Sequence, residues 1–136
     1  RTWSAPAADA LAGDQFMPWG AFDADGTLRI GTFDRSTDPA NHRYDYALLT
    51  VSVPGAFARS TVSTQQSDPT RDDRWFAATV NPAFPKASSF IGDYSNIAVV
   101  PGTTRVVAYW TDMREQACFP AWTCGHGEDP YFAYAS

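Results

Sequence analysis

The chain has 136 residues, the size of one ordinary domain, and 44% of them are hydrophobic. This apolar content excludes a largely disordered chain, because disordered segments lack the apolar surface needed to form a core. Ten Lys and Arg residues stand against fifteen Asp and Glu residues, and no basic cluster is present, so we do not expect nucleic acid as a partner.

Seven short segments carry the β-branched and aromatic residues typical of strands. In chain order, the predicted strands are residues 16–22, 27–33, 44–53, 59–64, 91–99, 104–111 and 131–135. Ten Pro and nine Gly residues interrupt the chain too often for long helices. Residues 7–11 and 72–78 are the only helix candidates, and both are short. The sequence therefore predicts an all-β, antiparallel fold.

Two pairs of these segments are separated by turn residues and are predicted to form hairpins. Asp23-Ala24-Asp25-Gly26 separates the first pair, and Pro101-Gly102 separates a later pair. The Asp-x-Asp-Gly order is similar to the start of a calcium loop, but the Gly comes too early and no Glu follows at the required place. We therefore expect a hairpin turn at Asp23–Gly26.

The two hairpins look like copies of one unit. Residues 16–35 end in Phe33-Asp34-Arg35, and residues 90–114 end in Asp112-Met113-Arg114, about 75 residues later. Repeated antiparallel hairpins are typical of β-propellers, in which each blade buries its faces against its neighbours. The connection over residues 67–89 is too long for a simple link between blades, so we predict a functional loop there.

Two cysteines, Cys118 and Cys124, enclose a short loop. Their separation fits a disulfide, which would stabilise the chain by about 2 kcal/mol. Free thiols or half of a metal site are the alternatives, although metal pairs usually lie closer and need a second pair. A disulfide predicts a secreted protein. No apolar run approaches the roughly 20 residues of a membrane span.

Three stretches carry a resemblance to a known family. Arg1-Thr2-Trp3-Ser4-Ala5-Pro6 is similar to the end of an Asp-box, and residues 16–35 and 90–114 are similar to inner blade hairpins. In this layout the chain resembles the bacterial neuraminidase repeat proteins, which are secreted sialidase-like propellers. It departs from the family in that no complete Asp-box is present, and the sequence after residues 46–53 reads Pro54-Gly55-Ala56-Phe57.

The resemblance implies about two blades of a six- or seven-bladed propeller. Residues 1–15 would be the outer strand of a preceding blade, 16–66 the first blade, 67–89 the long loop and 90–136 a second, incomplete blade. Arg1 would then be a processed or truncated end. The expected partner is the rest of the propeller, supplied by another chain of the same precursor or by further copies of this one. A compact independent domain is the remaining alternative.

Four charged residues close the two similar hairpins: Asp34, Arg35, Asp112 and Arg114. We expect them near one face of the propeller, where Arg35, Arg114 and Asp34 could orient the carboxylate or hydroxyls of a sugar. The alternative is structural, with each Arg paired to a neighbouring Asp or to the next blade.

Gly92-Asp93-Tyr94 offers a carboxylate beside an acid/base hydroxyl. Sialidases use a Tyr nucleophile with an acidic partner, so the resemblance makes Asp93, Tyr94 and Asp112 candidate catalytic residues. The Arg-Ile-Pro signature of the family is absent, which weakens this transfer. A two-carboxylate hydrolase, drawing also on Glu115 and Glu128, is a further possibility.

The remaining candidates are aromatic, acidic or His side chains. Trp75 and Trp122 are expected to be exposed and to stack on sugars, whereas Trp19 and Trp110 fall within strands and are expected in the core. No cofactor is expected to be required, but Asp68, Asp72 and Asp73 could hold a structural Ca²⁺ ion, with a solvated charge run as the alternative. His42 and His126 stand in no catalytic motif and are expected to be surface or structural residues.

These observations predict a glycan-facing module of a secreted sialidase-like propeller, which binds carbohydrate or forms part of a glycoside hydrolase. Two alternatives stay open, because one fold hosts unrelated activities. The chain could be a non-catalytic scaffold for docking proteins or ligands, or a lectin-like oligomer of two-blade units.

Overall fold

The computed structural model describes residues 2–53, 55–69, 91–117, 125–126 and 129–135. These residues contain the strands β1 (Gln15–Phe22), β2 (Leu28–Asp34), β3 (Asp45–Val53), β4 (Ala56–Thr61), β5 (Asn96–Val99), β6 (Val106–Asp112), β7 (Gln116–Ala117), β8 (Gly125–His126) and β9 (Asp129–Ala135). Each predicted strand segment overlaps an observed strand, whereas the short strands β7 and β8 were not predicted. The described residues contain no α-helix, so the short helix candidate at residues 7–11 is not helical, and the other candidate, residues 72–78, lies outside the described residues.

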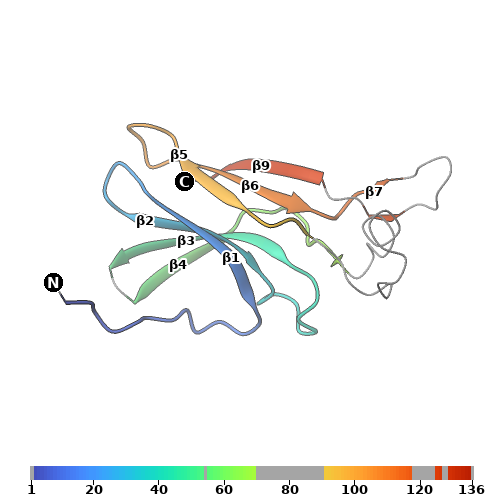
Figure 1. The fold of residues 1–136 in the computed structure, drawn as a ribbon, viewed down its shortest axis with the longest axis horizontal. Coiled ribbons are helices and arrows are strands. Elements are labelled where there is room, and N and C mark those ends of the chain that lie inside the picture. The colour runs from blue at the N-terminus through green and yellow to red at the C-terminus, as the bar shows by residue number, and fades with distance from the viewer. Residues whose placement is uncertain (1, 54, 70–90, 118–124, 127–128, 136) are drawn as a thin grey trace.

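The strands form antiparallel sheets (Figure 1). β1, β2, β3 and β4 pair in chain order to form a four-stranded sheet, and β5, β6 and β9 form a three-stranded sheet. β7 and β8 pair separately. The predicted hairpins β1–β2 and β5–β6 are confirmed. The all-β, antiparallel class is therefore confirmed, and no closed sheet occurs among the described residues.

The turn between β1 and β2 is held by the Asp23 carboxylate. Its Oδ1 accepts hydrogen bonds from the backbone N–H groups of Asp25 and Thr27 at 3.0 and 2.9 Å, and Arg29 Nε lies 2.8 Å from Oδ2. Gly26 has a φ of 78°, which other residues rarely adopt. The Asp23 carboxylate therefore binds groups of its own hairpin, and the prediction of a hairpin turn at Asp23–Gly26 is confirmed.

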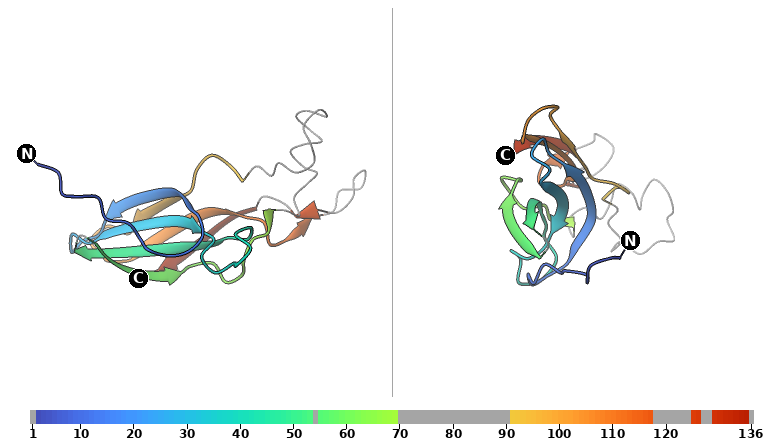
Figure 2. Two further views of the ribbon diagram at one scale, coloured as in Figure 1. Left: turned by 90° about the horizontal axis from the view of Figure 1, so that it is seen from below. Right: turned by 90° about the vertical axis from the view of Figure 1, so that its left-hand side faces the viewer.

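The two larger sheets pack face to face (Figure 2). An aromatic core lies between them, in which Tyr46 of β3 stacks on Trp110 of β6 with 5.1 Å between the ring centroids. The fully or nearly fully buried cluster comprises Phe33, Tyr44, Tyr46, Leu48, Ile97, Val106, Ala108, Trp110 and Met113. Gly31 makes this close approach possible, because a Cβ atom there would lie 2.4 Å from both Ile97 Cγ2 and Tyr46 Oη. The core prediction for Trp110 is confirmed.

Unlike faces of the two sheets meet in this core. The paired ends Asp34–Asp45 in the first sheet and Asp112–Asp129 in the second give a common reference. Because side chains alternate along a strand, Tyr46 lies on the face opposite to Asp45 and packs on Trp110, which shares its face with Asp112. The Asp-bearing face of the second sheet therefore contacts the other face of the first sheet.

Trp19 does not lie in the core, because its strand is the edge of the first sheet. Its side chain is 46% exposed, so the core prediction for Trp19 is wrong. The pairing of β1 with β2 shifts between Phe16 and Trp19, and Met17 has a φ of 51°. A bulge of this kind bends an edge strand and redirects its side chains, which strict alternation along the sequence does not anticipate.

The segment before β1 contains no strand over residues 2–14. Ala7 lies beside the turn at Gly55, and Gly13 lies against the backbone of Arg35, where a Cβ atom on Gly13 would come within 2.9 Å. The segment thus connects the β3–β4 turn with the end of β2, and its assignment to a preceding blade stays a prediction. No helix in the described part of the chain is long and apolar enough to span a membrane.

Candidate functional site

One end of the two sheets collects most of the described candidate residues. β2 and β6 end there at Asp34 and Asp112, β1 begins there at Gln15, and Gly92, which precedes β5, lies beside Thr111. The opposite end holds the hairpin tips, where Ala24 N–H donates to the Thr103 carbonyl at 3.2 Å. We call the end defined by Asp34 and Asp112 the carboxylate end.

Two contacts join the sheets at the carboxylate end. The Tyr44 hydroxyl donates to the Thr111 carbonyl at 3.2 Å, and the Met113 N–H donates to Ser67 Oγ at 3.0 Å. Tyr44 and Ser67 also pair with each other as an isolated β-bridge. The ends of β2 and β6 are therefore held in one structural unit.

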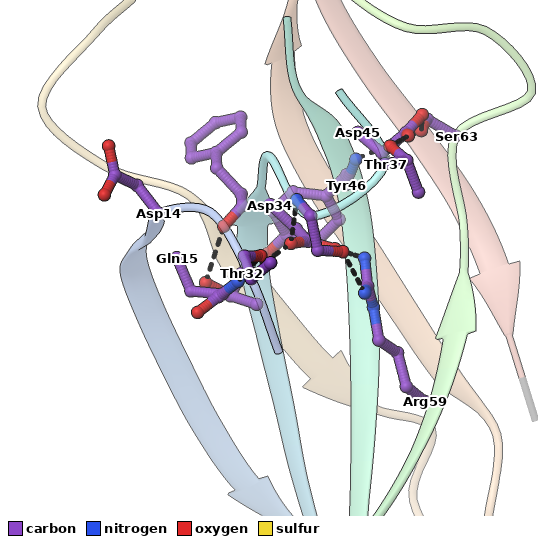
Figure 3. Close-up of polar contacts among 12 residues, drawn as sticks. Asp14, Gln15, Thr32, Asp34, Thr37, Asp45, Tyr46, Arg59 and Ser63 are labelled. Carbon is purple, nitrogen blue, oxygen red and sulfur yellow. Dashed lines mark hydrogen bonds and ion pairs between the residues drawn. The ribbon is translucent and has the colours of Figure 1, made fainter. Parts of the chain in front are cut away.

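Asp34 lies fully buried in a polar network (Figure 3). Its Oδ1 accepts hydrogen bonds from Gln15 Nε2 at 3.1 Å and from the Ser36 N–H at 2.9 Å, and its Oδ2 accepts from Ser36 Oγ at 3.1 Å. Arg59 of β4 forms an ion pair with the same carboxylate. Asp34 thus pairs with Arg59 and not with its neighbour Arg35.

A second buried carboxylate, Asp45, lies opposite Asp34 in the sheet. Thr37 Oγ1 and Ser63 Oγ donate to it at 2.7 and 2.9 Å, and Ser63 Oγ also accepts from the Tyr46 N–H at 3.0 Å. The sequence prediction missed both Asp45 and Arg59, because their contacts join residues far apart in the sequence. Arg59 had no local signal beyond its place in a predicted strand.

Asp112 is also fully buried and binds Arg114 closely. Arg114 Nε donates to Oδ1 at 2.7 Å, the Arg114 N–H donates to the same oxygen at 2.9 Å, and Trp110 Nε1 donates to Oδ2 at 3.1 Å. Burial by itself raises the pKa of Asp112, but the hydrogen bonds from Arg114 and Trp110 outweigh it and hold the pKa below its ordinary value. The Arg114 guanidinium also lies over the Tyr131 ring at 4.6 Å.

Arg35 is the least satisfied charged group of the predicted set. Its Nη1 lies 3.4 Å from Asp14 Oδ2, and its guanidinium lies 5.0 Å from the centre of the Phe16 ring. Its Nε is buried without a hydrogen-bond partner among the described residues. The side chain is 26% exposed, so its accessible N–H groups can donate to a carboxylate or hydroxyl ligand.

Asp93 and Tyr94 are exposed immediately before β5, and the Tyr94 side chain is 78% exposed. The next residue, Ser95, is buried and donates through Oγ to the Met17 carbonyl at 2.9 Å. Met17 follows Phe16, and the Arg35 guanidinium lies over the ring of Phe16. The bulge of β1 therefore connects Arg35 with the Asp93–Tyr94 segment.

A pocket of about 380 Å³ lies in the loop between β2 and β3. Asp38, Ala40, His42, Arg43 and Asp68 line it. Asp38 Oδ2 accepts hydrogen bonds from the backbone N–H groups of Arg43 and His42 at 2.7 and 2.8 Å, which lower its pKa from the ordinary value. Asp68, a predicted Ca²⁺ ligand, lies 3.6 Å from Arg43 Nε. Within the described ranges no group of three His, Cys, Asp or Glu side chains could hold a metal ion.

Several predicted site residues lie outside the described residues: Trp75, Trp122, Asp72, Asp73, Cys118, Cys124 and Glu128. The sugar-stacking, Ca²⁺-binding and disulfide predictions that depend on them stay predictions. His126 lies on β8, and the position of its side chain is not described. Glu115 accepts a hydrogen bond from the Tyr131 hydroxyl, which raises the pKa of Tyr131.

Comparison of the chain with protein-family models, with curated proteins and with solved structures finds no match. The candidate site is therefore defined by its own geometry. That geometry separates Asp34, Asp112 and Arg114 from Arg35, Asp93 and Tyr94. The first three are internally paired, with both carboxylates fully buried and the Arg114 side chain 10% exposed, and the other three are more accessible.

Proposed function

We propose that the chain is a ligand-facing module of a secreted, sialidase-like β-propeller protein and binds an acidic carbohydrate at its carboxylate end. The proposal depends on one observation, the Arg35 side chain, which is 26% exposed and whose Nη1 makes a long 3.4 Å contact with the exposed Asp14. A planar guanidinium with free N–H groups matches the geometry of a sugar carboxylate. The exposed Asp93 and Tyr94 would contact the sugar hydroxyls beside it.

The fold supports a propeller in two respects. β1 to β4 pair in chain order, as the four strands of a blade do, and the second sheet stacks on the first through unlike faces. Stacking through unlike faces can continue from blade to blade around an axis, whereas a two-fold sandwich would bring like faces together. The expected partner in this proposal is the rest of the propeller.

The buried pairs at this end are better suited to structure than to catalysis. The oxygens of Asp112 already accept from Arg114 and Trp110, and the side chain is fully buried, so no oxygen is free to face a substrate. Of the three catalytic candidates, Asp93 and Tyr94 remain accessible. If the complete protein is a glycoside hydrolase, we propose that this pair and not Asp112 faces the scissile bond.

Binding of sialylated and neutral oligosaccharides, followed by NMR chemical-shift perturbation, tests the proposal. We expect Arg35→Gln to weaken binding of the sialylated sugar at least tenfold, which corresponds to about 1.4 kcal/mol. Arg105→Gln is a matched control, because its guanidinium lies 5.0 Å from the Tyr134 ring, as that of Arg35 does from Phe16. Binding that is unaffected by Arg35→Gln would contradict the proposed site.

A fluorogenic sialoside assay separates binding from hydrolysis. Turnover that disappears in Tyr94→Phe would support an enzyme, and binding without turnover would support a lectin. No binding and no turnover would favour the second candidate, a scaffold that docks other proteins, which the stacked sheets also fit. Export, inferred from Cys118 and Cys124, and a Ca²⁺ loop that joins Asp68 to Asp72 and Asp73 are further parts of the proposal; of these residues only Asp68 lies within the described ranges.

A further inference from the structure

The stacking of the two sheets leaves one face of each sheet without a sheet partner in the described structure. In the first sheet this outer face is the one that carries Asp34, and in the second it is the face opposite to Asp112. One outer face is thus an Asp-bearing face, and the other is a face opposite to the Asp. In the core of this chain, faces of these two kinds already pack against each other.

Both outer faces carry exposed apolar side chains. On the first sheet, the outer patch comprises Phe22, Leu28, Val51 and Phe57, which the strand pairing places on one face. Phe22 is 70% exposed, and the other three are partly buried. Isolated exposed apolar residues are ordinary, but a contiguous group across four paired strands indicates a contact surface.

The outer patch of the second sheet is aromatic. It comprises Val107, Tyr109, Phe132 and Tyr134, and the pairing of β6 with β9 sets Tyr109 directly opposite Phe132. Tyr109, Phe132 and Tyr134 are each more than half exposed. The inner face that covers Trp110 is likewise aromatic at Phe33 and Tyr46, so the same kind of face presents aromatic side chains in both sheets.

We infer that the aromatic outer patch of one copy of this chain binds the outer patch of the first sheet of a second copy. The contact would repeat, between chains, the unlike-face packing that already joins the two sheets within a chain. Such a contact is head-to-tail, so each added copy leaves one patch of each kind free, and assembly continues into a ring or an open chain. This inference rests on the sheet packing and not on the proposed sugar site.

Sedimentation velocity over a range of protein concentrations tests the contact with two single variants. Phe22→Arg disables the first patch, and Phe132→Arg disables the aromatic patch; both residues are mostly exposed, so the fold should persist, as circular dichroism and thermal melting would check. We expect the wild type to associate and each variant alone to be monomeric. A mixture of the two variants retains one intact patch of each kind and should form a 1:1 dimer that does not grow.

The control is Tyr94→Arg, which changes an exposed aromatic residue on neither patch and should associate like the wild type. A monomeric wild type at millimolar concentration would overturn the inference. Continued dimerisation of Phe22→Arg alone would also overturn it, because that result requires two aromatic patches to bind each other. Loss of sugar binding in Tyr94→Arg with association intact would separate the two proposals.

Discussion

The ends of β2 and β6 each bury a carboxylate, and the two carboxylates are neutralised by arginines from different places in the chain. Each strand ends in a fully buried Asp whose Oδ1 accepts the backbone N–H two residues later, from Ser36 in one case and from Arg114 in the other. Each buried carboxylate also has an arginine partner. Asp34 takes Arg59 from β4, two strands away, whereas Asp112 takes Arg114 from its own turn.

The difference follows from the width of the two sheets. The first sheet has a fourth strand, β4, which supplies Arg59 from the far side of β3. The described part of the second sheet has three strands, and its carboxylate is satisfied locally by Arg114 and by Trp110. A buried carboxylate needs compensation wherever it lies, and the sheet determines whether that compensation comes from a neighbour in sequence or in space.

The largest expected effects come from neutralising either carboxylate. Asp34→Asn and Asp112→Asn each leave a largely buried arginine without its partner, so we expect each to lower the free energy of unfolding by about 3 kcal/mol. Urea denaturation measures the change. A loss below about 1 kcal/mol for either variant would indicate that its carboxylate is not part of the structural frame, and would return that residue to the candidate ligand-facing set.

Hydrogen exchange would show whether the two pairs act over different distances. Asp34→Asn removes a link between β2 and β4, so we expect exchange of the β4 amides to accelerate more than that of the β9 amides. Asp112→Asn should instead accelerate exchange around Trp110 and Arg114. Uniform acceleration in both variants would contradict the distinction between a long-range and a local pair.

A smaller effect is expected at the interface between the sheets. Gly31→Ala places a Cβ atom 2.4 Å from Ile97 Cγ2 and Tyr46 Oη, so both side chains must shift in a closely packed core, and we expect a loss of about 2 kcal/mol. Gly20→Ala is the matched control on the edge strand β1, where the nearest atom, Leu28 Cδ1, would lie at 3.5 Å. Equal melting temperatures for the two variants would contradict close packing at Gly31.

Local sequence patterns were sufficient to predict the strands and two of the hairpins. Runs of β-branched and aromatic residues locate β1 to β6 and β9, and the residues Asp23–Gly26 are specific for a tight turn. β4 begins at Ala56, three residues earlier than predicted, because Gly55 with a φ of 86° forms a hairpin turn that the sequence reading did not assign. Strand positions depend mainly on residues that are close in sequence, so they can be predicted from the sequence.

The candidate site was only partly accessible from sequence, because its contacts are non-local. The chain-order grouping of Asp34 with Arg35 and of Asp112 with Arg114 is right for the second pair and wrong for the first, where Arg59 replaces Arg35. Nothing near Arg59 in the sequence identifies Asp34 as its partner. The exposure of Trp19 likewise depends on the bulge in β1 and on its edge position.

The smallest predicted effect concerns the pH dependence of the Asp112 pair. The pKa of Asp112 is lowered in the folded protein, so the native state holds fewer protons there than the unfolded chain does. The stabilisation by this carboxylate is therefore complete above the pKa of an ordinary Asp, near 4, and is lost as the pH falls through the lower folded value. We expect the stability difference between wild type and Asp112→Asn to shrink as the pH falls below about 4, because protonation of Asp112 removes the charge that Asn also lacks. A difference in unfolding free energy that stays constant across this range would show that Asp112 acts through its shape and hydrogen bonds and not through its charge.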